Sequence, residues 1–205
     1  MIAGQTGGIG VSIRSKGIAI AVCLSLAGCV SLGGKVPDQL ISLTSQASAP
    51  AGDLRSGPAA PAIVVLDPEV GRVLNVTRVP VQVDDTTVAY LQDAVWVDRP
   101  ARLFRGVLSE TIRAKTGRLV IEAGEFDIKQ KNVLTGRLID MGYDARGQSV
   151  VVRFDAMLED AEGEVRSRRF EAVITGISAD AAQVAPALND AANDVAVEVA
   201  DWVGG

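Results

Sequence analysis

A short apolar run that ends in a cysteine decides which part of this 205-residue chain is available to fold. Two positive charges, Arg14 and Lys16, precede the apolar residues Gly17–Leu26, and a pair of small residues ending at Gly28 lies directly before Cys29. This order is typical of a bacterial lipoprotein signal. A membrane-spanning helix would need about 20 apolar residues, roughly twice the length of this run. We therefore expect cleavage after Gly28 and a mature chain that begins at Cys29.

The cysteine itself predicts how the mature chain is held. The thiol of Cys29 is expected to carry a diacylglycerol and its amino group an acyl chain, and no other cofactor is expected. Several acyl chains at one residue give durable attachment to a bilayer, where a single chain is marginal. We expect residues 1–28 to be the signal peptide, residues 29–36 a Gly- and Ser-rich tether, and residues 37–205 a single domain of ordinary length.

Composition excludes several classes of function. The chain has no histidine, which removes the commonest general base and the commonest metal ligand. Its second cysteine, Cys23, leaves with the signal peptide, so no disulfide can form within the mature chain. Cleavage also removes Arg14 and Lys16 and no acidic residue, so the net charge of −5 becomes −7. Such an acidic chain is a poor nucleic-acid binder, and we expect neither a metal site nor catalysis.

The hydrophobic pattern predicts an α+β fold, with an antiparallel β-sheet and two amphipathic helices packed on it. Residues 44–62, rich in Ala, Pro, Gly and Ser, are predicted to form a mobile loop. Pro80 is expected at an edge or a bulge, because proline has no N–H to donate. Strands are expected at residues 37–43, 63–67, 73–83, 88–91, 133–143, 150–158 and 165–177.

Two segments repeat their apolar residues every three or four positions, as helices do. The first runs from Pro100 to about Lys115 and ends before Gly117, and the second follows an N-cap at Ser178-Ala179-Asp180. The basic residues of the first helix are expected to be solvated, not to form a binding stripe. Trp202, at the end of the second apolar stripe, is expected in the core, although a partner-binding role is open.

Two pairs of neighbouring carboxylates are the residues that acid–base chemistry could use. Asp84 and Asp85 form one pair, and Glu159 and Asp160 the other. Both pairs lie at predicted turns, where aspartates commonly bind their own backbone. We therefore expect turn-stabilising roles and not a hydrolase site.

The order of these parts resembles the family of ABC-type transport auxiliary lipoproteins. The resemblance extends over nearly all of the mature chain. It rests on a lipobox, the Val79-Pro80 segment, Tyr90–Trp96 leading into an amphipathic helix, a β meander, and a closing helix Val184–Ala192 that ends at Asp201-Trp202. It implies a non-enzymatic accessory protein of a system that moves phospholipid-like molecules between two membranes. The implied partner is the MCE-domain lipid-binding subunit of that system, with a homo-oligomer also possible.

The resemblance also implies a location and leaves one alternative. Val30, directly after Cys29, is not the aspartate that favours retention in the inner membrane. Similarity to sorted lipoproteins then implies a lipid anchor in the outer membrane, on its periplasmic face. The family's usual aromatic pair in the first strand is replaced here by Leu40-Ile41. Small α+β lipoproteins also regulate envelope or cell-wall assembly, and that role remains the alternative.

Overall fold

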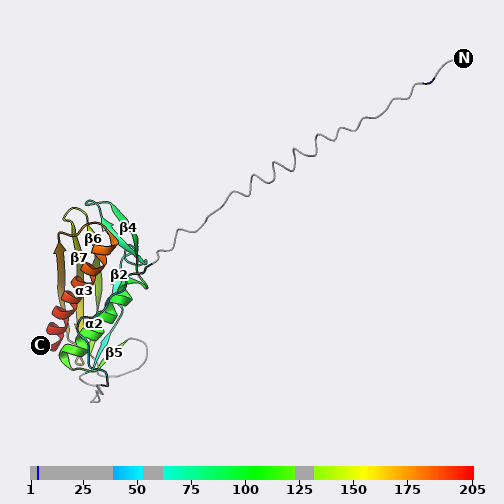
Figure 1. Ribbon diagram of the computed structural model, residues 1–205. Coiled ribbons are helices and arrows are strands. Elements are labelled where there is room, and N and C mark those ends of the chain that lie inside the picture. Colours follow the sequence, from blue (N-terminus) through cyan, green and yellow to red (C-terminus); the bar gives the residue numbers. More distant parts are fainter. Residues whose placement is uncertain (1–3, 5–38, 53–61, 123–131) are drawn as a thin grey trace. The chain divides into compact units, whose positions relative to one another are not determined.

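The computed structural model describes residues 4, 39–52, 62–122 and 132–205 (Figure 1). The predicted signal peptide, Gly28, Cys29 and the tether lie outside these residues. The strands are β1 (Ile63–Val65), β2 (Glu69–Val70), β3 (Arg78–Gln82), β4 (Val88–Val95), β5 (Val120–Glu122), β6 (Asn132–Asp144), β7 (Ser149–Glu159) and β8 (Val165–Thr175). The helices are α2 (Pro100–Thr116) and α3 (Ala181–Gly204).

The sheet is built around β6, the longest of its strands. On one side, β6 pairs along its whole length with β7, and β7 pairs with β8, so these three form the predicted antiparallel meander. On the other side, β6 pairs in turn with β1, β2 and β3. β5 extends the sheet beyond β1, and β4 extends it beyond β3.

The prediction of α+β is confirmed, but the sheet is mixed and not purely antiparallel. β1, β2 and β3 all run parallel to β6, and β1 runs parallel to β5. The reason is the connection through α2, which follows the first four strands and precedes β5 and β6. A crossover helix of this kind returns the chain in its original direction. The predicted strand over 73–83 was too long, because residues 72–77 form a turn and bends before β3.

A bulge keeps the apolar residues of β6 on one face. Leu134 and Leu138 face the helices at even positions, whereas Met141 and Tyr143 do so at odd positions. The register with β7 shifts between Leu138 and Asp140, which inserts one residue and restores the alternation. The helix-covered face, called the inner face here, is therefore continuously apolar. The opposite face, called the outer face, carries charged and polar side chains.

Both helices lie over the inner face (Figure 1). α2 begins with Pro100 and ends at Gly117, whose φ of 68° is left-handed, as predicted. The Asp180 side chain caps α3 by accepting a hydrogen bond from the Gln183 N–H. The Phe104 ring meets the Phe154 ring edge-on at 5.3 Å, which joins α2 to β7. Among the described residues, neither helix has the length and apolar character needed to cross a membrane.

Trp202 packs at the border of the core. Its ring is half-buried and meets the Phe170 ring edge-on at 5.7 Å, while the Arg166 guanidinium lies 5.6 Å from the ring centre. These contacts connect the last turn of α3 to β8. Most of the residue is thus used in packing, as the sequence predicted.

Residues 44–49, called the strap here, run along the two helices. The predicted strand over 37–43 is reduced to a single bridge between Ile41 and Trp96. Beyond it, Asn193 accepts a hydrogen bond from the Gln46 N–H and donates one to the Thr44 carbonyl, at 2.8 and 2.9 Å. The Ala49 N–H donates to Glu110 of α2 at 2.8 Å. These bonds fix residues that composition had assigned to the mobile loop, whereas mobility of residues 53–61 stays a prediction.

Replacing Asn193 with alanine should lower the free energy of unfolding by about 2 to 3 kcal/mol, because two strap backbone groups lose their partner at a buried site. Urea unfolding followed by circular dichroism measures the change. Asn189→Ala is the matched control, since Asn189 lies one turn earlier and its side chain accepts a single strap bond, from the Thr44 N–H. A loss no larger than that of the control would contradict this role for Asn193.

Candidate functional site

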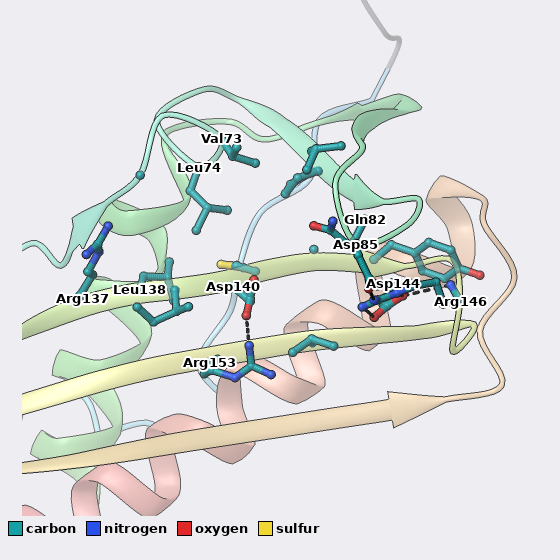
Figure 2. A pocket seen from close by; sticks show the side chains of 18 residues that line it. Val73, Leu74, Gln82, Asp85, Arg137, Leu138, Asp140, Asp144, Arg146 and Arg153 are labelled. Carbon is teal, nitrogen blue, oxygen red and sulfur yellow. Dashed lines mark hydrogen bonds and ion pairs between the residues drawn. The ribbon is translucent and has the colours of Figure 1, made fainter.

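A cavity opens beside the middle of β6 (Figure 2). Its volume is about 520 Å³, within the range of small-molecule sites. The loop before β3, β3 itself and the start of β4 lie on one side, and the outer face of β6 and β7 on the other. It is lined, along the sequence, by Gly71, Val73, Leu74, Pro80, Gln82, Asp85, Val88, Arg137, Leu138, Ile139, Asp140, Met141, Gly142, Tyr143, Asp144, Arg146, Val151 and Arg153.

A gap in the sheet creates this cavity. β2 pairs with β6 as far as Leu138, and β3 pairs with it only from Tyr143. Between them, residues 139–142 have no partner strand on that side. In an antiparallel ladder, half of the backbone groups point away from the partner strand. Residues 140–142 pair with β7, so part of their backbone N–H and C=O groups face the gap. Such groups need a partner from water or a ligand.

A close approach of two backbones sets one end of the cavity. A Cβ at Gly142 would lie 2.5 Å from the Pro80 carbonyl oxygen, so no larger residue fits there. This approach lets β3 join β6 directly after the gap. Pro80 lies where the register of β3 with β4 shifts, which is the bulge position that its missing N–H predicted.

Charged side chains form two ion clusters along the cavity. At the far end, Arg146 bridges Asp144, at 2.6 Å, and Asp85, at 2.5 Å. Hydrogen bonds from Arg146 lower the pKa of Asp144 to about 2, so this carboxylate stays ionised at any physiological pH. In the middle, Arg153 of β7 pairs with Asp140 of β6 and with Glu171 of β8.

Arg137 lies at the near end and differs from these two arginines. It is exposed, and within the described residues no carboxylate lies in ion-pair contact with it. Its cross-strand neighbour is Asp155, which is held instead by two hydrogen bonds from Arg169, at 2.5 and 2.7 Å. These bonds also lower the pKa of Asp155, with a smaller contribution from the Arg137 charge. The cavity therefore has one cation whose charge is not neutralised by direct contact.

One aspartate of each carboxylate pair singled out in the sequence holds a turn, as predicted. Asp84 accepts hydrogen bonds from the Thr86 and Thr87 N–H groups, both at 2.8 Å, and these bonds lower its pKa. Asp160 accepts from two backbone N–H groups in the β7–β8 turn. Glu159 is exposed. Asp85 lines the cavity and contacts Arg146.

The basic side chains of α2 are used in ion pairs within the domain. Arg102 pairs with Asp98, Arg113 with Glu110, and Lys115 with Asp201. Arg105 reaches both Asp67 and Glu122 and so links α2 to the ends of β1 and β5. These contacts argue against a stripe of basic residues on α2 that is free to bind a partner.

Apart from Asp85, the cavity residues were not identified from the sequence. The sequence pattern assigns three of them to the polar side of ordinary half-exposed strands: Arg137, Asp140 and Arg153. The departure of β6 from strict alternation around Ile139 was the available signal, since a bulge often marks a functional position. The gap depends on parallel pairing of β2 and β3 with β6, which no local pattern encodes. Among the described residues, no group of three acidic or cysteine side chains could hold a metal ion.

Comparisons with known proteins give a family and a fold. Residues 42–200 match the family model described as "ABC-type transport auxiliary lipoprotein component". Protein XCC0632 from Xanthomonas campestris has a similar crystal structure, with a TM-score of 0.64 and 18% identity, covering 80% of this chain and 94% of that one. An uncharacterised protein is similar at a TM-score of 0.63 and 13% identity, covering 80% and 99%. No curated protein matches the chain.

Proposed function

Because the chain belongs to the family of ABC-type transport auxiliary lipoproteins, we propose that it is a non-enzymatic accessory component of a system that moves phospholipids between the inner and outer membranes. The family match over residues 42–200 is the observation that carries this proposal. It includes the strap, α2, every strand and α3 up to residue 200, so it covers nearly all of the described domain.

We place the protein at the periplasmic face of the outer membrane, held by lipid at Cys29. The motif before Cys29 and the residue after it support this placement. Gln39, the first residue of the described domain, lies ten positions after Cys29, and ten extended residues span at most about 35 Å. A lipid at Cys29 would therefore keep the domain close to the membrane surface.

The proposed partner is the MCE-domain lipid-binding subunit of the transport system. An accessory lipoprotein of this kind contributes by contact, tying that subunit to the outer membrane. The chain has no histidine, the commonest general base, which is consistent with a role by contact.

Co-purification tests the proposal. An affinity-tagged chain extracted from membranes with mild detergent should retain the MCE subunit, detected by mass spectrometry. A tagged outer-membrane lipoprotein of unrelated family is the control for non-specific capture. Absence of the MCE subunit, with the tagged chain correctly located, would contradict the proposal. A deletion strain with defective cell-wall incorporation and normal lipid asymmetry would favour the cell-wall alternative instead.

A further inference from the structure

We propose that the cavity beside β6 binds a single-chain anionic amphiphile, with its acidic group next to Arg137 and its hydrocarbon chain between the β3 side and β7. This inference rests on the proposed function, because a lipid-transport protein is where such a ligand would be met. It assigns to this chain a direct contact with lipid, in addition to its contacts with a partner subunit.

The apolar part of the ligand is matched by the walls of the cavity. Val73 and Val88 are each 40% exposed on the β3 side. Ile139 and Val151 line the opposite side and are half-buried. Contact with a hydrocarbon chain would remove these surfaces from water, at about 25 cal/mol per Å². The cavity volume suits one chain of a small amphiphile better than the two chains of a whole phospholipid.

The charge of the ligand follows from which ions are already paired. Asp85 and Asp144 both pair with Arg146, and Asp140 and Glu171 both pair with Arg153. A cationic head group would compete with these arginines for their carboxylates. An anionic head group meets Arg137 without displacing any ion pair, and Figure 2 shows this residue at the end of the cavity opposite Arg146.

The gap in the sheet supplies further partners for a head group. Residues 139–142 have no partner strand on the cavity side, because β2 pairs with β6 only as far as Leu138 and β3 only from Tyr143. Backbone N–H groups together with one arginine are a common way to bind a carboxylate or a phosphate. Both head groups share this chemistry, and the test below separates them.

Photo-crosslinking tests the assignment on the mature lipoprotein, reconstituted in phosphatidylcholine vesicles. Three twelve-carbon probes carry a diazirine in the chain: a carboxylic acid, a lysophosphatidic acid and an uncharged alcohol. We expect the acidic probes, or one of them, to label peptides that contain Val73 or Val151, and the alcohol to label them about fivefold less. That factor is the most that one exposed ion pair usually contributes.

Four variants test whether labelling depends on the cavity or on charge and surface elsewhere on the sheet. Val151→Trp should fill the cavity and lower labelling by at least about tenfold, whereas Val173→Trp, at the cross-strand neighbour outside the cavity, should leave it unchanged. Arg137→Gln should lower labelling by the acidic probes to that of the alcohol. Arg168→Gln, on the opposite face of the sheet, is its control. Circular dichroism checks folding, and Val73→Asp at the exposed rim serves if Val151→Trp does not fold.

Several results would overturn the assignment. Equal labelling by acids and alcohol would remove the role of Arg137, and labelled peptides that all lie outside the cavity would remove the site. Equal losses of labelling in Val151→Trp and Val173→Trp would also remove the site. These results leave the transport role standing if the MCE subunit still co-purifies. Loss of co-purification with labelling intact would instead contradict the proposed function and keep the lipid site.

Discussion

Replacing Gly136 with alanine should lower the free energy of unfolding by more than about 4 kcal/mol, close to the total stability of many domains. Gly136 lies in β6 with a φ of 155°, a conformation that L side chains rarely adopt. A Cβ there would come within 2.1 Å of the Asp155 carbonyl oxygen and 2.8 Å of the Phe154 ring. Neither can move freely, because Asp155 is in the central strand pair and the Phe154 ring packs on Phe104.

The measurement is urea unfolding of Gly136→Ala against the parent chain, with Gly163→Ala as the control. Gly163 also has a positive φ, of 87°, but nothing lies within 4 Å of the position of its Cβ. It should therefore show only the backbone cost, about 1 to 2 kcal/mol. Equal losses in the two variants would show that the close contact at Gly136 is relieved by small shifts of β7.

Replacing Cys29 with serine should abolish attachment of fatty acid to the protein. The serine hydroxyl cannot form the thioether that carries the diacylglycerol, and anchoring by acyl chains is lost with it. Cells grown with radiolabelled palmitate should incorporate label into the parent chain and none into the variant. The expected effect is complete, not partial, because residue 29 is the only proposed lipidation site.

Cys23→Ser is the matched control, since Cys23 is the other cysteine of the chain and lies inside the predicted signal peptide. It should retain full labelling. Label that persists in Cys29→Ser, or that disappears in Cys23→Ser as well, would place the modification elsewhere and remove the basis for an outer-membrane anchor.

Helices were the part of this fold that local sequence predicted best. Pro100 and Gly117 bound α2, and Asp180 caps α3, because each of these residues satisfies a need of a helix end that is independent of the rest of the chain. The β6–β7–β8 meander was equally readable, since short polar turns connect strands of alternating pattern. Pairing of β1, β2 and β3 with β6 joins residues far apart in sequence, and their parallel direction depends on the crossover through α2.

The candidate site shows the same limit. Asp84 and Asp160 were correctly assigned to turns, because an aspartate that binds its own backbone is a local feature. Arg137 differs from the other two arginines because its cross-strand neighbour, Asp155, is held by Arg169. The sheet register decides which of the three cavity arginines has no carboxylate in direct contact. That register is set by the packed fold.

The strap gives the domain a defined response to tension. A pull on the residues before Gln39 reaches the bridge between Ile41 and Trp96 first, and then the bonds that Asn189 and Asn193 make to the strap. Force from that side would therefore load the end of β4 first, through Trp96, and only then α3, through Asn189 and Asn193.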